Sequence, residues 1–161
     1  MQLYISGLVD IPQLKIQANI TKILSIMEFE PPPYVGVGVD HTILIVNDDE
    51  IVGNFMAPSL HTISDILRFS YKCNNEDNVL IHCFAGVSRS TAAAMVFVYD
   101  KTRSMEACEN MLYNYGKAAP NRKICSLADY WFHNSDPILF KLADKLCKEK
   151  KFIEATNNKL L

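Results

Sequence analysis

The sequence predicts an α/β fold: a central, mostly parallel sheet of about four to five strands with helices on both faces. Short apolar runs alternate with stretches of helical periodicity in the first half of the chain, as in strand–helix units. These runs are almost continuously apolar, which is typical of strands covered on both sides. A short polar loop links the last run directly to a helix, which predicts a ligand site at the carboxyl end of a strand.

The strands are expected where β-branched and apolar residues cluster between turn-forming residues. Three prolines at 31–33 break the chain into a loop between two of these runs. The expected strands span residues 2–6, 21–26, 41–46 and 79–82.

The helices are expected between and after these strands, with Ser104 and Asn121 as N-caps and Gly116 as a stop. Pro58 suits the first turn of its helix. The helix that follows the last strand is apolar almost all round, so we expect it to be buried. The expected helices span residues 11–19, 58–72, 88–101, 104–115, 121–133 and 136–150.

Length and composition favour one globular domain, residues 1–150, followed by a polar C-terminal tail, residues 151–161. The net charge of −2 and the scattered lysines provide no basic stripe for nucleic acid. No run approaches 18 apolar residues, so no membrane span is expected, and residues 1–10 do not resemble a signal peptide.

The five cysteines include no Cys-x-x-Cys pair, which argues against a disulfide framework or a zinc site. A reducing compartment such as the cytoplasm fits this pattern. The four histidines show no metal-ligand spacing, and we expect neither a metal nor a cofactor. Cys73 and Cys125 remain open as redox partners of Cys83.

The most informative stretch is His82-Cys83-Phe84-Ala85-Gly86-Val87-Ser88-Arg89-Ser90, which joins the last strand to the buried helix. Loop N–H groups and the helix N-terminus would turn toward a common point and bind an anion. The planar Arg89 guanidinium can hold two phosphate oxygens at once. An inert buried thiol at Cys83 is the plainer alternative.

The pattern His-Cys-x-x-Gly-x-Ser-Arg-Ser resembles the signature loop of the cysteine-dependent protein tyrosine phosphatases, in particular the compact dual-specificity branch. Rhodanese-like and arsenate-reducing proteins, which also place a cysteine at a strand end, normally lack this full set. Val46-Asn47-Asp48 resembles the family's general-acid loop, and Ala119-Pro120-Asn121 resembles a segment found after the signature helices. The likeness covers about residues 3–132, is close to small predicted tyrosine phosphatases of bacteria, and implies the phosphatase fold.

The resemblance implies a phosphatase in which Cys83 is the nucleophile and forms a cysteinyl-phosphate intermediate. Arg89 and the backbone N–H groups of residues 84–89 would bind the phosphate, and Gly86 would let the loop approach it. Ser90 would ease departure of the sulfur, a role compatible with capping the helix. His82 and Asn121 are expected to orient the residues of the site without contacting the substrate.

The general acid is expected among Asp48, Asp49 and Glu50, which follow the third strand. Asp48 matches the family position. Asp49 stays open, because a shift of one residue is not visible in the sequence. Three consecutive acids are also typical of a solvated turn.

The variable loop residues Phe84, Ala85 and Val87 are not basic, which favours a single phosphomonoester on a protein, phosphotyrosine above all. Phosphate and vanadate-like anions are the expected ligands. A small phosphorylated metabolite, carbohydrate or lipid as substrate, or a non-catalytic phosphate-binding module, are the alternatives. The basic residues expected near the rim of the site are Lys117, Arg122 and Lys123.

Overall fold

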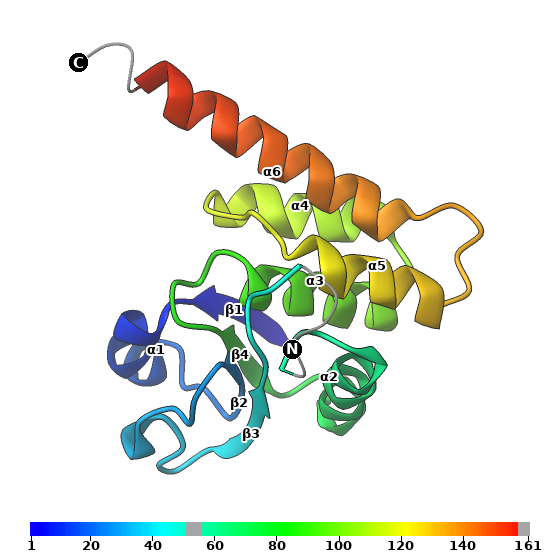
Figure 1. Cartoon of the computed structure of the whole chain (residues 1–161). Helices are drawn as coiled ribbons and strands as arrows, with labels where there is room; N and C mark the ends of the chain where they lie inside the picture. Colours follow the sequence, from blue (N-terminus) through cyan, green and yellow to red (C-terminus); the bar gives the residue numbers. More distant parts are fainter. Residues whose placement is uncertain (51–55, 158–161) are drawn as a thin grey trace.

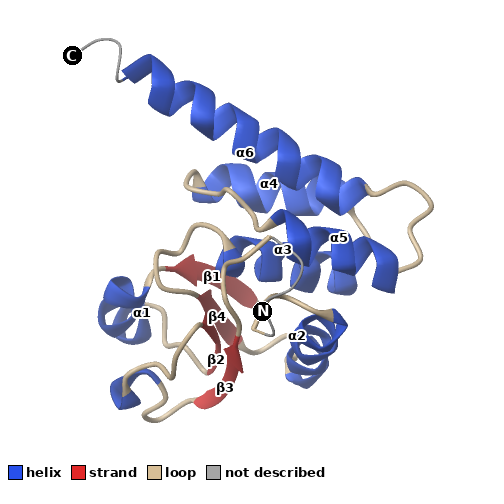
Figure 2. Ribbon diagram, in the orientation of Figure 1, coloured by secondary structure: helices blue, strands red, loops and turns tan. Residues whose placement is uncertain are grey.

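The structure, a computed structural model, describes residues 1–50 and 56–157 (Figure 1). The strands in these residues are β1 (Gln2–Ser6), β2 (Lys22–Met27), β3 (Asp40–Ile45) and β4 (Asn78–His82). They form one sheet in the order β1-β4-β2-β3, and each neighbouring pair is parallel (Figure 2). The predicted α/β fold with a parallel sheet is confirmed.

Helices cover both faces of the sheet, as predicted, but unequally (Figure 1). One face carries α1, while α2 and α3 pack on the other, and α4, α5 and α6 form a further layer beyond α3. The helices are α1 (Ile11–Gln17), α2 (Leu60–Lys72), α3 (Arg89–Thr102), α4 (Met105–Tyr115), α5 (Arg122–Trp131) and α6 (Ile138–Asn157).

Alternation along the strands divides the apolar side chains between two cores. Ile23 of β2 and Leu80 of β4 face the small core under α1. Their neighbours Leu24 and Ile81 face the larger core, which the remaining helices complete. Both faces of β2 and β4 are therefore buried, which explains why these two strands are continuously apolar in sequence. The edge strand β3 differs, because Ile43 and Ile45 are exposed.

Helix α3 runs through the larger core, as its apolar sequence predicts. Residues 89–97 are all buried, so the helix that carries the end of the predicted loop has little freedom to move. Small side chains at Ala92, Ala93 and Ala94 lie on different sides of the helix and allow close packing against the sheet and the neighbouring helices. The predicted site is therefore built on a rigid strand and a rigid helix.

The capping predictions hold at both ends of α4: Ser104 Oγ accepts from Ala107 N at 3.1 Å, and Gly116 ends the helix with φ of 74°. Helix α2 begins later than predicted. Ser59 is its N-cap, and its N–H donates to Thr62 Oγ1 at 3.1 Å, so Pro58 precedes the helix.

Helix α6 continues to Asn157 instead of ending near Lys150, so part of the expected tail is helical. Residues 158–161 of that tail lie outside the described residues. None of the helices in the described ranges is both long and apolar enough to cross a membrane.

Candidate active site

The signature loop (residues 83–89) lies between β4 and α3, at the carboxyl edge of the sheet. Cys83 is buried, with 2 % of its surface exposed. The Gly86 N–H donates to Cys83 Sγ at 3.3 Å, and Ser90 Oγ lies 3.3 Å from the same sulfur. The sulfur thus sits inside the curve of the loop, next to the first turn of α3.

The carbonyl oxygens of the signature loop accept hydrogen bonds from groups outside it. The pairs are Leu8 N to Phe84 O at 3.0 Å, Tyr115 Oη to Gly86 O at 2.7 Å, Ala119 N to Val87 O at 3.0 Å and Asn121 N to Ser88 O at 3.2 Å. Contacts from three separate segments therefore fix the shape of the loop and hold its carbonyls on the outside.

Gly86 adopts a positive φ of 74°, a conformation that glycine favours. A Cβ built on it would lie 2.4 Å from the backbone nitrogen of Gly7 and 2.5 Å from the carbonyl carbon of Ser6. The steric reason for the glycine therefore differs from the expected one. It lets the loop pack against the end of β1, on the side where the Cβ would stand.

Arg89 is buried, with 5 % of its surface exposed, at the first position of α3. Its Nη1 donates to the carbonyl of Val46 at 2.8 Å. Its Nε is buried, and no acceptor for it exists among the described residues. An unsatisfied buried donor costs about 1–3 kcal/mol, so an acceptor supplied by a ligand would be favoured here.

His82 is fully buried behind the loop and contacts no solvent. Its Nε2 lies 2.5 Å from Ser25 Oγ, which in turn lies 2.7 Å from His41 Nε2. Its Nδ1 lies 3.3 Å from the Cys83 carbonyl. Burial lowers the pKa of His82 to about 4, so the imidazole is neutral at pH 7.

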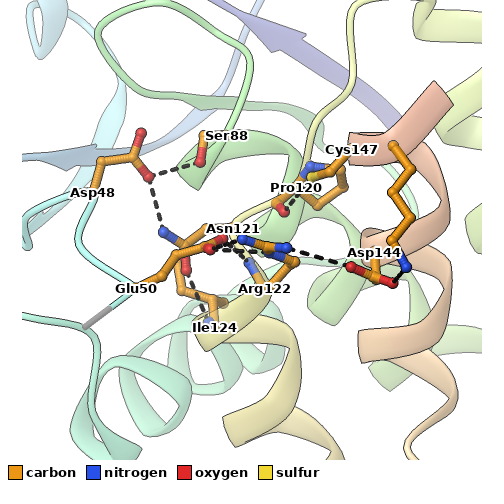
Figure 3. A network of polar contacts seen from close by, with 10 residues as sticks. Asp48, Glu50, Ser88, Pro120, Asn121, Arg122, Ile124, Asp144 and Cys147 are labelled. Atoms are coloured by element: carbon orange, nitrogen blue, oxygen red, sulfur yellow. Dashed lines mark hydrogen bonds and ion pairs between the residues drawn. The ribbon is translucent and has the colours of Figure 1, made fainter. Parts of the chain in front are cut away.

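Asp48 contacts the signature loop directly, as Figure 3 shows. Its Oδ1 accepts from Ser88 Oγ at 2.6 Å and from Asn121 Nδ2 at 2.9 Å. Asn121 Oδ1 also accepts from Ile124 N at 3.0 Å and so caps α5, as predicted. The acid loop (residues 46–50) is therefore docked on the signature loop and on the start of α5.

Other acids of this loop face different surroundings. Asp49 is half-buried, and Glu50 pairs with Arg122 at the start of α5. Arg122 was expected near the rim as a cation for substrate. In the structure its guanidinium instead pairs with two carboxylates, Glu50 and Asp144.

Two residues beside the loop carry no signal in the sequence. Tyr115, at the end of α4, donates to the Gly86 carbonyl, and burial together with the nearby Cys83 raises the pKa of its phenol. Phe29, after β2, meets Phe84 edge-on with ring centroids 6.4 Å apart. Phe84 is 57 % exposed and Phe29 46 %, so an aromatic pair flanks the loop at the surface.

Cys73, Cys108 and Cys125 are buried in the larger core, and no disulfide joins cysteines of the described residues. Burial raises the pKa of Cys73 to about 11 and that of Cys108 to about 12. Cys125 is completely buried, and its pKa is also raised. These thiols stay protonated at neutral pH and are therefore poor nucleophiles.

Comparison with solved structures identifies the fold. The crystal structure of DUSP15 matches with a TM-score of 0.67 and 24 % identity, over 89 % of this chain and 90 % of that chain. The Cydia pomonella PTP-2 phosphatase matches with a TM-score of 0.61 and 24 % identity, over 81 % of this chain and 85 % of that chain. The chain has the dual-specificity phosphatase fold.

The same fold occurs in the structure of PTPMT1 in complex with PI(5)P, which matches with a TM-score of 0.56 and 12 % identity. That match covers 90 % of this chain and 94 % of that chain. No protein-family model and no curated protein sequence matches the chain. These matches confirm the phosphatase fold that the sequence resemblance implied. In this fold Cys83, Arg89, Ser90 and Asp48 lie at one edge of the sheet.

Proposed function

We propose that the protein is a phosphomonoester hydrolase that transfers a phosphoryl group first to Cys83 and then to water. The observation that carries the proposal is the pairing of two features on one rigid loop. Cys83 Sγ lies inside the curve of the loop, and Arg89 presents a buried Nε that has no acceptor among the described residues. A phosphate dianion in front of the sulfur would supply that acceptor.

In the first half-reaction, the Cys83 thiolate attacks phosphorus while the phosphorus–oxygen ester bond breaks. Arg89 and the loop N–H groups hold the equatorial oxygens. Asp48, docked on Ser88, delivers a proton to the departing alkoxide or phenolate oxygen. The alcohol leaves, and the phosphoryl group remains on sulfur.

In the second half-reaction, water attacks phosphorus and the Asp48 carboxylate takes its proton. The phosphorus–sulfur bond breaks, and inorganic phosphate leaves. The Ser90 hydroxyl, 3.3 Å from the sulfur, donates a hydrogen bond to the departing thiolate. This step regenerates the starting protonation states and needs no metal or cofactor.

For the substrate we propose a phosphorylated protein, with phosphotyrosine preferred, in a reducing compartment such as the cytoplasm. A substrate with several phosphates needs extra cations to offset their desolvation. The loop residues Phe84, Ala85 and Val87 provide none, and the charge of Arg122 is engaged by Glu50 and Asp144. The exposed Phe29 and Phe84 rings favour an aromatic leaving group.

Turnover of p-nitrophenyl phosphate by the wild-type protein and by Cys83→Ser tests the reaction. We expect turnover by the wild type, competitive inhibition by vanadate, no inhibition by EDTA, and below about one per cent activity in the variant. The variant should still bind vanadate or phosphate. Binding of phosphate by the wild type without turnover would instead identify a non-catalytic phosphate-binding module.

Steady-state kinetics on three substrate types test the specificity. We expect the highest kcat/KM on phosphotyrosine peptides, and lower values on phosphoserine peptides and phosphoinositides, because phenolate is the better leaving group. A preference of about tenfold or more for a phosphoinositide would contradict the proposed substrate class.

A further inference from the structure

Arg122, the first residue of α5, binds Glu50 of the acid loop through three donors (Figure 3). Its backbone N–H donates to Glu50 Oε1 at 2.8 Å, and its Nε and Nη2 donate to Glu50 Oε2 at 2.9 Å and 2.6 Å. The carboxylate therefore lies at a helix N-terminus and in the fork of a guanidinium at the same time. Both features favour a carboxylate in a defined orientation.

The other side of the Arg122 guanidinium faces α6. Its Nη1 donates to Asp144 Oδ1 at 3.3 Å, and Asp144 also pairs with Lys148 at 2.5 Å. Because Asp144 occupies one edge of the fork, the guanidinium has little freedom to turn away from Glu50. The hydrogen bonds to both carboxylates raise the pKa of Arg122 further above its usual value.

The acid loop is thus held at both ends by arginines. Arg89 Nη1 donates to the Val46 carbonyl at 2.8 Å at one end, and Arg122 holds Glu50 at the other. Asp48 lies midway between these two anchors. Its exposed side chain accepts from Ser88 and Asn121, and the backbone of the loop brings the carboxylate within reach of both donors.

We propose that Arg122 is a positioning residue that holds the acid loop through Glu50, so that Asp48 can protonate the leaving group. The inference rests on the proposed function. General acid catalysis contributes about 10²–10⁴-fold, and its benefit is largest for leaving groups that are poor without a proton. A less firmly held acid loop should therefore lower kcat for substrates with poor leaving groups and change kcat little for substrates with good ones.

A series of aryl phosphates with leaving phenols of low to high pKa tests this role. In Arg122→Gln we expect kcat for the poorest leaving group to fall about tenfold or more, and kcat for the best to change less than about twofold. Glu50→Gln removes the same ion pair from the other side and should give the same pattern. Thermal unfolding of each variant shows whether it is folded at the assay temperature.

In the Asp48→Asn variant, which lacks the general acid, loss of the Arg122–Glu50 ion pair should no longer affect kcat. If Arg122 acts through Asp48, then adding Arg122→Gln or Glu50→Gln to Asp48→Asn should change kcat by less than about twofold for every leaving group. Lys145→Gln is the matched control, because it removes another ion pair of α6, with Glu109 at 3.0 Å, away from the acid loop. We expect it to leave the leaving-group dependence unchanged.

An equal loss for all leaving groups in both Arg122→Gln and Glu50→Gln, or a loss that persists in the Asp48→Asn background, would overturn the positioning role. Unchanged kinetics in the Glu50→Gln variant would overturn it as well. These outcomes differ from failure of the proposed function, in which the wild-type protein would turn over none of the aryl phosphates.

Discussion

Asn121 Nδ2 lies 2.9 Å from Asp48 Oδ1, while Oδ1 of the same amide accepts from the Ile124 N–H at 3.0 Å. One side chain, with 1 % of its surface exposed, therefore caps α5 and holds the candidate general acid. Its backbone N–H also donates to the Ser88 carbonyl. The start of α5 is in this way part of the candidate active site.

The two roles of Asn121 can be separated by substitution. Serine is as good an N-cap as asparagine, but it is too short to reach Asp48. We expect Asn121→Ser to lower kcat for poor leaving groups, and Asn121→Ala to lose about 1 kcal/mol more stability than Asn121→Ser. Urea unfolding and aryl phosphate kinetics measure the two effects. Equal kinetics of the wild type and Asn121→Ser would show that the hydrogen bond from Asn121 to Asp48 does not contribute to catalysis.

Asp48 and Asp49 can be distinguished by their effect on the pH–rate profile. We expect Asp48→Asn to lower kcat by about 10²-fold or more and to remove the basic limb, which reports loss of the protonated acid. Asp49→Asn should keep the basic limb and most of the activity, because Asp48 is the acid that the structure places against Ser88. If Asp49→Asn removes the basic limb and Asp48→Asn keeps it, Asp49 is the general acid.

The fold was predictable because its signals are local. Continuous apolar runs, helical periodicity and caps at Ser104 and Asn121 are read within a few residues of each other. The errors lie at element ends. The expected tail contains the helix formers Lys151, Glu154 and Ala155, and α6 extends through them to Asn157.

The candidate site was only half predictable. The signature loop is one continuous stretch, so Cys83, Arg89 and Ser90 were identifiable together. The partners of that loop come from distant segments and follow no spacing rule. Tyr115 reaches Gly86 from the end of α4, and Phe29 reaches Phe84 from the loop after β2.

Burial of His82 should make stability depend on pH. Its pKa falls from 6.5 to about 4 on folding, so between these values only the unfolded chain binds the proton. The free energy of unfolding should therefore decrease as pH falls through this range and level off below it. The contribution lost between about pH 7.5 and about pH 5 is about 2 kcal/mol.

Urea unfolding of the wild type and of His82→Gln at these two pH values measures that contribution. The variant is expected to be less stable near neutral pH and to approach the wild type at the lower pH, because it has no imidazole to protonate. A constant difference between the two proteins at both pH values would show that His82 does not titrate in this range.

The aromatic pair beside the loop should affect substrate binding. We expect Phe29→Ala to raise KM for an aryl phosphate several-fold and to leave KM for an alkyl phosphate nearly unchanged, since edge-on ring contacts are worth about 0.5–1.5 kcal/mol. Val9→Ala, at a highly exposed apolar residue, is a suitable control. An equal rise for both substrates would indicate a general effect on the loop.

The most direct test of the mechanism is to trap the phosphoryl group on sulfur. In Ser90→Ala the hydroxyl that lies 3.3 Å from Cys83 Sγ is removed, so breakdown of the intermediate should become slower than its formation. We predict a burst of released phenol equal to the enzyme concentration, and one phosphoryl group on the Cys83 peptide by mass spectrometry after acid quench. Turnover without phosphorylated Cys83 under these conditions, or turnover that persists in Cys83→Ser, would exclude a cysteinyl-phosphate intermediate.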